Sequence, residues 1–359
     1  MDRRKIIIVQ LVMLFIFINC NSVFASEYNT NLLNINILGN NSILFLVILL
    51  LIGVFFIIKL LNNNKLINNE ILKQQDIIKE KQNIITQKTK TIKEISEAFS
   101  ETKEDLKSSI YYAERIQRAV IPQKSEIKNL FTNSFVYFSP RDIVSGDFYT
   151  CTQTTNYKII IVADCTGHGI PGGFLSMLGL SALKDLLSKR ILTNNINPGE
   201  ILNALRHFII TSFAEETDDN NTTISDGMDI TFCAFNNEMT QLKYATADHT
   251  IYVFRDGEIQ KLKGNRMPIG RHPKQDTPFE TFTFDLKKND MVYLCSDGIQ
   301  DQFGGENDVK FMTKRLVQML QDVGNESIDN QYQTISKIVD DWKLGKNQFD
   351  DQTLIGIRI

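Results

Sequence analysis

The chain has 359 residues, enough for about two domains, and a formal net charge of −3 at pH 7. That charge, together with the lack of a basic stretch interleaved with aromatic residues, argues against nucleic acid as a partner. The five cysteines form no CxxC pair and no metal-type spacing. Four of them lie in apolar runs or at their ends, which indicates reduced core thiols in a cytosolic domain. The five cysteines are Cys20, Cys151, Cys165, Cys233 and Cys295.

The first sixty residues are typical of a membrane-targeted chain. A basic start and an apolar stretch predict a signal peptide or an uncleaved signal anchor over 1–25. An Asn-rich exported segment, 26–42, is too short to fold, and the apolar run 43–61 is long enough for a transmembrane helix, which takes about 17–25 residues. No Lys or Arg lies between Ile6 and Ile58, whereas several lysines follow. This asymmetry places the rest of the chain on the cytoplasmic side of the inner membrane.

Residues 62–121 read as a coiled-coil signalling helix. Pro and Gly are absent from Leu66 to Val120, and Pro122 ends the helix. Every seventh residue from position 71 is apolar, which predicts a homodimer seam. The seam is Ile71, Ile78, Ile85, Ile92, Phe99, Leu106, Ala113 and Val120. Its companion positions are mostly polar, so the dimer is expected to be marginal and able to shift or rotate. A solvated spacer helix is the alternative.

Beyond residue 122, short strand patterns alternate with long helices. Strands are expected at 134–139, 147–153, 157–164, 229–236, 241–247, 250–255, 280–285, 290–296 and 352–358, and helices at 171–189, 199–215, 307–321 and 328–344. Asp256-Gly257 predicts a hairpin turn, and Pro171 suits a first helical position. Many short antiparallel strands with paired helices predict an α+β sandwich.

Four acidic residues end or follow apolar runs in this part of the chain. Three of them are Asp147, Asp164 and Asp297, and the fourth lies in the segment Asp350-Asp351-Gln352-Thr353. Several carboxylates gathered at strand ends make an all-oxygen site for a hard divalent cation. Burying them together without such a cation costs too much free energy.

Seven motifs in a fixed order carry a family resemblance, which covers about residues 112–359. The chain resembles the SpoIIE/RsbU branch of the metal-dependent (PPM, type 2C) serine/threonine protein phosphatases. The motifs are Arg115–Pro122, Pro140–Tyr149, Ala163–Gly172, Gly227–Ile230, Met267–Gly270, Ser296–Gly298 and Asp350–Thr353.

This resemblance implies an αββα sandwich over 122–359, in which antiparallel sheets are flanked by helices. It also implies two bridged Mn²⁺ or Mg²⁺ ions and a metal-activated water. Carried over by motif, the metal ligands would be Asp147, Asp164, the backbone carbonyl of Cys165, Asp297 and Asp350. The same four aspartates would be the catalytic residues, acting through metal-bound water, and Asp351 is less favoured as a ligand than Asp350.

Three residues near these motifs have open roles. Arg141 does not have the spacing of the phosphate-binding Arg of the animal enzymes. His168 lies four residues after Asp164, which favours a turn-stabilising role over general-acid catalysis. Asp229 is interpreted either as a ligand of a third, weak metal or, preferably, as a solvated loop carboxylate.

The function expected from these observations is a membrane-tethered phosphatase that acts on phosphoserine or phosphothreonine of a regulatory protein in bacterial signal transduction. The resemblance suggests a phosphorylated anti-sigma-factor antagonist of the STAS type as the substrate. A catalytically inactive scaffold that binds the same partner is the alternative, although the complete set of carboxylates disfavours it. A nucleotide cyclase or phosphodiesterase would need a purine-recognition feature, and the sequence shows none.

Overall fold

The computed structural model describes residues 12, 14–15, 35–193, 196–213 and 226–359. They divide into two compact units, Met1–Ala98 and Phe99–Ile359, which are considered separately. The predicted signal segment 1–25 lies outside the described residues except at positions 12, 14 and 15, so it stays a prediction. The same holds for the first part of the exported segment, up to residue 34. Residues 35–42 are helical, which is earlier than the predicted start of the transmembrane helix at 43.

One helix, α2 (Ile35–Val120), accounts for the described part of the first unit after position 15 and continues into the second unit. Its apolar part lies within a stretch, beginning at Ile43, whose most apolar window has a mean hydropathy of 3.2 and no buried residues. Such a segment is long and apolar enough to cross a membrane. Farther along, the seam residues Ile78 and Ile92 are 52% and 67% exposed. The described part of this chain therefore provides no partner for the predicted seam.

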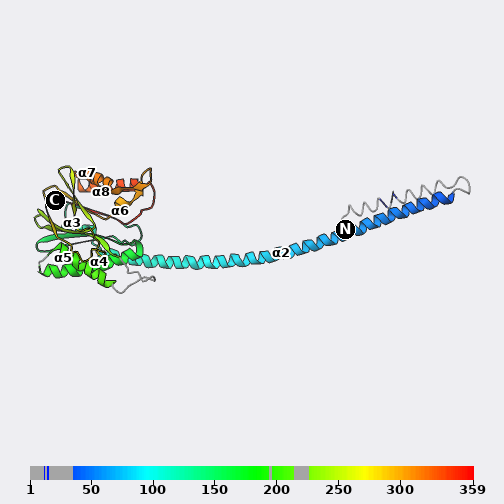
Figure 1. Ribbon diagram of the computed structural model, residues 1–359, viewed down its shortest axis with the longest axis horizontal. Coiled ribbons are helices and arrows are strands. Elements are labelled where there is room, and N and C mark those ends of the chain that lie inside the picture. Colours follow the sequence, from blue (N-terminus) through cyan, green and yellow to red (C-terminus); the bar gives the residue numbers. More distant parts are fainter. Residues whose placement is uncertain (1–11, 13, 16–34, 194–195, 214–225) are drawn as a thin grey trace. The chain divides into compact units, whose positions relative to one another are not determined.

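The second unit is built on two five-stranded antiparallel sheets (Figure 1). One sheet has the order β1-β12-β9-β6-β7 and the other β2-β3-β4-β5-β8. The first comprises β1 (Ser134–Ser139), β12 (Gln352–Arg358), β9 (Met291–Cys295), β6 (Thr250–Arg255) and β7 (Glu258–Lys263). The second comprises β2 (Phe148–Gln153), β3 (Tyr157–Cys165), β4 (Met228–Asn236), β5 (Gln241–Ala247) and β8 (Phe282–Asp285).

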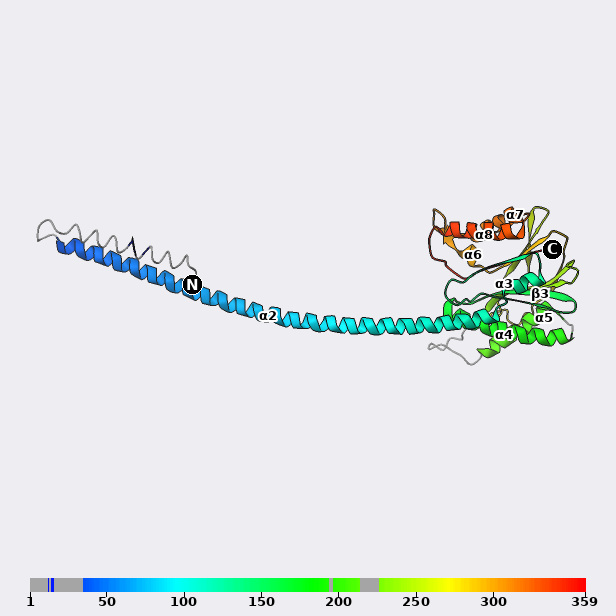
Figure 2. The ribbon, with the colours of Figure 1, turned by 180° about the vertical axis from the view of Figure 1, so that it is seen from behind.

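A pair of helices covers the outer face of each sheet, as Figure 2 shows from the opposite side. Helices α4 (Gly169–Thr193) and α5 (Pro198–Ser212) pack on the β2–β8 sheet, and α7 (Met312–Val323) and α8 (Ile328–Lys343) pack on the β1–β7 sheet. Shorter elements complete the unit: α3 (Lys124–Leu130), α6 (Gly298–Asp301), β10 (Phe303–Gly304) and β11 (Val309–Lys310). The predicted sandwich of antiparallel sheets flanked by helices is thus confirmed.

The core consists of two clusters of buried apolar residues, and the central strands are buried on both faces. Ile160 and Phe232, on the adjacent strands β3 and β4, are fully buried in the first. Tyr293 and Leu316 lie in the second cluster, between the β1–β7 sheet and helices α7 and α8. Close packing on both sides holds the strand ends at fixed positions, which is what a site of converging side chains requires.

Most predicted elements are confirmed to within a few residues, but two details were wrong. The helix expected at 307–321 begins at Met312, because residues 309 and 310 pair with β10 as strand β11. Helix α4 begins at Gly169, so Pro171 is its third residue rather than its first. The Asp256-Gly257 hairpin is confirmed, and both turn residues have positive φ values, 53° and 87°.

A buried ion pair beside the β8–β9 turn gives a test of this packing. Asp290 is 2% exposed and accepts two hydrogen bonds from Arg255, at 2.8 and 2.6 Å, and one from the backbone N–H of Lys287. Asp290→Ala would leave the partly buried guanidinium without its carboxylate partner and with only its hydrogen bond to the Asp285 carbonyl, and we expect it to lower the free energy of unfolding by about 3–5 kcal/mol. Denaturant unfolding of the full-length protein measures this loss.

The matched control is Asp185→Ala, which breaks an ion pair of similar length, 2.6 Å to Lys189, on the exposed surface of α4. A pair exposed to water contributes about 1 kcal/mol or less. Equal losses in the two variants would contradict the burial of the Arg255–Asp290 pair.

Candidate active site

The two sheets bring the four predicted acidic motifs to one end of the sandwich. In one sheet, β2 pairs with β3 so that Phe148 lies opposite Ala163, which makes Asp147 and Asp164 neighbours. In the other sheet, β12 pairs with β9 so that Leu354 lies opposite Cys295, which brings Asp350 and Asp297 to the same end of that sheet. The arrangement follows from strand register, since each aspartate ends or adjoins a buried strand.

Asp147 joins the two sheets. It is 1% exposed, and its Oδ2 accepts hydrogen bonds from the hydroxyls of Ser296 and Thr353, both at 2.6 Å. Its Oδ1 is buried and has no hydrogen-bond partner. Since Ser296 and Thr353 come from the other sheet, this carboxylate fixes the two acidic pairs relative to each other and keeps one oxygen available.

Asp351 has a different task from Asp350. Its carboxylate accepts the backbone N–H groups of Arg141 and Gly146, each at 2.7 Å, and so anchors the loop that carries Asp147. Asp350 is half-buried, and one of its oxygens accepts only the N–H of Asp351. This division of roles is consistent with Asp350 rather than Asp351 as the candidate ligand.

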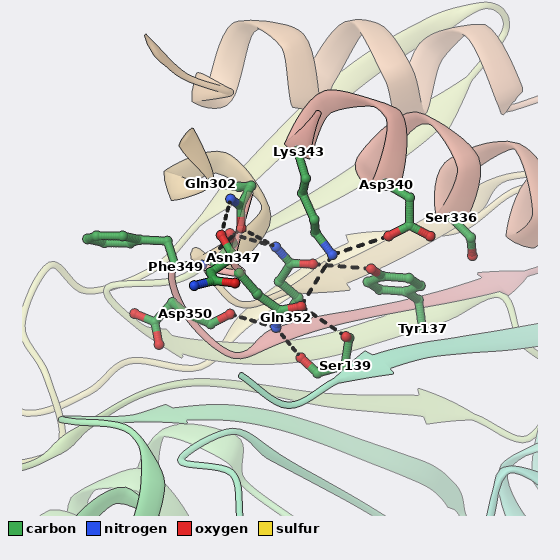
Figure 3. Close-up of polar contacts among 12 residues, drawn as sticks. Tyr137, Ser139, Gln302, Ser336, Asp340, Lys343, Asn347, Phe349, Asp350 and Gln352 are labelled. Atoms are coloured by element: carbon green, nitrogen blue, oxygen red, sulfur yellow. Dashed lines mark hydrogen bonds and ion pairs between the residues drawn. The ribbon is translucent and has the colours of Figure 1, made fainter. Parts of the chain in front are cut away.

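Three glutamines hold the segment that carries Asp350 (Figure 3). Gln348 donates to the carbonyls of Ser139 and Asp350, at 2.6 and 2.8 Å. Gln302 accepts from the N–H of Phe349 and from Gln352. The Asp350 carboxylate points away from this cluster in Figure 3, so the network positions its backbone and leaves its side chain for the site.

Close backbone approach explains two glycines at this end. A Cβ on Gly146 would lie 2.5 Å from the carbonyl oxygen of Gly167 and 3.2 Å from that of Cys165. A Cβ on Gly172 would lie 2.2 Å from the Gly167 oxygen. The Asp147 turn and the bend after Asp164 therefore touch through their backbones, and the Cys165 carbonyl lies beside the turn, as its predicted ligand role requires.

Burial raises the pKa of the carboxyl groups of Asp147, Asp164, Asp297 and Asp351. The pKa of Asp147 rises to about 7, chiefly through desolvation, although the Ser296 and Thr353 hydroxyls oppose the shift. Desolvation, followed by the nearby charges of Asp147, Asp297 and Asp350, holds the pKa of Asp164 well above its usual range. Like charges gathered in a poorly hydrated place favour the protonated form unless a cation is bound.

The donor chemistry and the charge of these residues fit a pair of divalent cations. The oxygen-only donor set, the crowding of the acidic groups and the unpartnered Oδ1 of Asp147 all point to such a group. In the described part of the chain, however, no three His, Cys, Asp or Glu side chains are arranged so that they could hold a metal ion as they stand.

The three residues with open roles have clear positions. His168 is exposed, and its Nδ1 lies 2.8 Å from Asp142 Oδ2, in agreement with the turn-stabilising interpretation. The Arg141 side chain is exposed, and only its backbone reaches the acidic group. Asp229 was wrongly preferred as a solvated loop residue. It is half-buried in β4 opposite Asp164, and burial, with help from Asp248 and Asp297, raises its pKa to about 7.

Sequence reasoning missed several supporting residues. Gln117, near the end of α2, is buried. It accepts from the backbone N–H of Ser145 at 3.0 Å and donates to the Ser145 carbonyl at 2.6 Å and to the Ser176 hydroxyl at 2.9 Å. Ser296 and Thr353 stand beside or near the predicted acidic residues, so proximity to those motifs was the only signal for them. Gln117 lies within the motif Arg115–Pro122, but nothing in the sequence singles it out.

Comparison with known proteins defines the class. A solved structure, the "SiaA-PP2C domain of Pseudomonas aeruginosa", is 28% identical, with a TM-score of 0.63, and covers 72% of this chain and 98% of that one. A second structure, the PP2C phosphatase domain of SpoIIE from Bacillus subtilis with a fragment of its regulatory domain, has a TM-score of 0.50 at 18% identity and covers 63% of each chain. The second unit thus has the fold of PP2C-type phosphatases.

The family follows from the sequence match. Residues 155–359 match the family model described as "Stage II sporulation protein E (SpoIIE)", and the chain belongs to this family. A curated relative, "Phosphoserine phosphatase RsbU" of Bacillus subtilis (strain 168), is 24% identical over 260 residues, which is 71% of each protein. The chain is a PP2C-type protein serine/threonine phosphatase of bacterial signalling, a metal-dependent class.

The raised pKa values predict how pH acts on the protein without cations. Asp147 titrates near pH 3.8 when exposed and near pH 7 when folded. Its destabilising effect is absent below pH 3.8, where it is protonated in both states, and grows as the pH rises to about 7. For Asp147 alone, the free energy of unfolding falls by on the order of 4 kcal/mol over this range. In chelator, the unfolding midpoint should therefore fall over this range, and Mn²⁺ should raise it more at pH 8 than at pH 5.

Asp147→Asn keeps the shape of the side chain and removes the titration, so its midpoint should depend less on pH in chelator. The exposed Asp185→Asn is the matched control and should follow the wild type. Parallel pH curves for the wild type and Asp147→Asn would show that this carboxyl group is not the source of the effect.

Proposed function

We propose that this protein is a membrane-tethered, metal-dependent phosphatase that hydrolyses phosphoserine or phosphothreonine on a regulatory protein. The observation that carries the proposal is the meeting of Asp147, Asp164, Asp297 and Asp350 at one end of the sandwich, with Asp147 hydrogen-bonded across both sheets. All four carboxylates are present, one buried and three half-buried, which is expensive for a protein that only binds a partner. The inactive-scaffold alternative is therefore less favoured.

Two Mn²⁺ or Mg²⁺ ions are the cofactors that we propose, held by the four aspartates and the Cys165 carbonyl. When bound, such ions lower the pKa of water, orient a phosphoryl group and neutralise its charge. The residues of the chain supply position and charge. Ser296 and Thr353 fix one oxygen of Asp147, while Asp351 fixes the Arg141–Gly146 loop, so the remaining Asp147 oxygen keeps its place.

The substrate is proposed from the relatives. RsbU of Bacillus subtilis carries the name phosphoserine phosphatase, and the match to it covers 71% of this chain. We infer a phosphorylated protein substrate here as well, and a phosphorylated anti-sigma-factor antagonist of the STAS type is the candidate that the family resemblance suggests.

Hydrolysis should require a divalent cation and the predicted ligands. For the full-length protein in mild detergent with Mn²⁺, we expect Asp164→Asn or Asp297→Asn to lower the turnover of a phosphoserine peptide by at least about 100-fold, more than the loss of a residue that only supports a ligand. Each variant loses a charge that cations need, and neither should prevent folding, because Asn relieves the crowding of buried charges. Release of inorganic phosphate is the measurement.

Asp185→Asn, a change of the same kind on exposed α4, should retain wild-type turnover. Excess chelator should abolish hydrolysis, and added Mn²⁺ should restore it. Full activity in chelator, or wild-type turnover in Asp164→Asn, would be incompatible with the proposed site.

Tethering and dimerisation are further parts of the proposal. The apolar part of α2 is unburied and long enough to span a bilayer, which supports an inner-membrane location with the catalytic unit in the cytoplasm. The seam after it is exposed and has a seven-residue period, which supports a homodimer. Near the end of the same helix, Gln117 holds the backbone of Ser145, two residues before Asp147. A rotation of the paired helices would thus act on the loop of the first ligand.

Replacement of Ile78, Ile85 and Ile92 by Asp places three charges in the seam. We expect a monomer with altered turnover, because three buried apolar contacts per helix are lost and like charges face each other. Light scattering of the full-length protein in detergent gives the oligomeric state, and phosphate release gives the turnover.

The control adds the same three charges off the seam, as Asn83→Asp, Thr86→Asp and Gln87→Asp, and should remain dimeric. A monomeric seam variant with unchanged kinetics would show that the helix only tethers the catalytic unit. A seam variant that is still dimeric would place the interface elsewhere.

A further inference from the structure

A pocket of about 450 Å³ adjoins the acidic end of the sandwich. Its lining includes three acidic residues, Asp229, Asp248 and Asp297, and also three cations that the proposed phosphatase reaction does not use, Lys261, Lys263 and Arg266. The acidic residues come from β4, from the turn between β5 and β6, and from the residues after β9. The two lysines come from β7, which is the edge strand of its sheet. The pocket therefore combines part of the candidate metal site with a separate basic surface.

The strand register places the two lysines on one face. Lys261 pairs with Tyr252 and Lys263 with Thr250, and both of these partners also line the pocket. Residues two apart on a strand project to the same side, so the two ammonium groups act on the same space. All three cations are exposed, and within the described chain none of them forms an ion pair. Unpaired cations in a concave surface favour an anionic ligand.

A buried histidine of the same pocket has one ring nitrogen without a hydrogen-bond partner. His249 is 8% exposed, and its Nδ1 lies 3.3 Å from the hydroxyl of Thr231. Its Nε2 is buried and has no hydrogen-bond partner. Burial lowers its pKa to about 4, so the ring is neutral at pH 7. If the Thr231 hydroxyl donates to Nδ1, Nε2 carries the hydrogen and is a donor for a ligand. A buried polar atom without a partner is costly, and a bound group would satisfy it.

We propose that this pocket is a recognition subsite for acidic side chains close to the phosphoserine of the protein substrate. The inference rests on the proposed function, because that function places the phosphoryl group at the neighbouring carboxylates and their cations. A peptide chain leaving that point passes the pocket, and Lys261, Lys263 and Arg266 select Asp or Glu there. Bound cations neutralise Asp297 and its neighbours. Of the other acidic lining residues, the exposed Asp248 is outnumbered by the three basic side chains, so the lining favours an acidic peptide.

Two phosphoserine peptides of equal length test the subsite, one with three Glu residues next to the phosphoserine and the other with three Gln. The full-length protein in mild detergent with Mn²⁺ should show a higher kcat/KM for the Glu peptide, and the preference should decrease with added salt. Lys261→Glu with Lys263→Glu should lower the ratio of the two kcat/KM values by about tenfold. Lys261→Gln with Lys263→Gln should give a smaller decrease of the same sign.

Lys287→Glu with Lys288→Glu is the matched control, since these adjacent exposed lysines follow β8 and do not line the pocket. It should keep the wild-type ratio. A wild-type enzyme without preference, or an unchanged ratio in both Lys261/Lys263 variants, would overturn the subsite.

A failure of the proposed function has a different outcome, namely that the wild type hydrolyses neither peptide. Fluorescence anisotropy of the labelled Glu peptide then decides the subsite by itself. Binding that is weakened about tenfold by the Lys261/Lys263 charge reversal, and not by the control, supports it. Absence of binding to the wild type, or equal binding to the wild type and to the Lys261/Lys263 charge-reversal variant, overturns it.

Discussion

The structure of the candidate site depends on the burial of several like charges at one end of the sandwich. Asp147 is the centre of this arrangement, because it is buried and bonded to hydroxyls from the opposite sheet while one of its oxygens has no partner. A folded chain tolerates such crowding only by protonation or by binding cations. We therefore expect bound cations to relieve the free energy that the crowded carboxylates cost the protein.

The rest of the fold keeps these groups in place. Gln302, Gln348 and Gln352 hold the Asp350 segment through hydrogen bonds, and Asp351 ties the Asp147 loop to the end of β12. Contacts of this kind hold backbone positions and leave the ligating oxygens unengaged. They help to hold four aspartates from four chain segments at one end of the sandwich.

Control and recognition are expected to reach the site by different elements. The α2 helix contacts the Asp147 loop through Gln117, so a change in the helix has a short route to a ligand. The basic pocket shares Asp229 and Asp297 with the acidic end, so a substrate bound there lies next to the reacting group. With this separation, the helix could be adapted to a signal and the pocket to a substrate without any change in the acidic residues.

The sequence by itself determined the strands, the paired helices, the acidic motifs and the family, because buried strands and their terminal aspartates leave local patterns in the chain. It did not determine which hydroxyl supports Asp147, that Asp351 anchors a loop, or that Asp229 is half-buried in β4 opposite Asp164. The helix start expected at 307 also failed, since residues 309 and 310 pair with β10. These features depend on contacts between residues far apart in the chain, such as Asp147 with Thr353 or Gln117 with Ser145. Only the register and packing of the folded sheets bring such residues within hydrogen-bond distance.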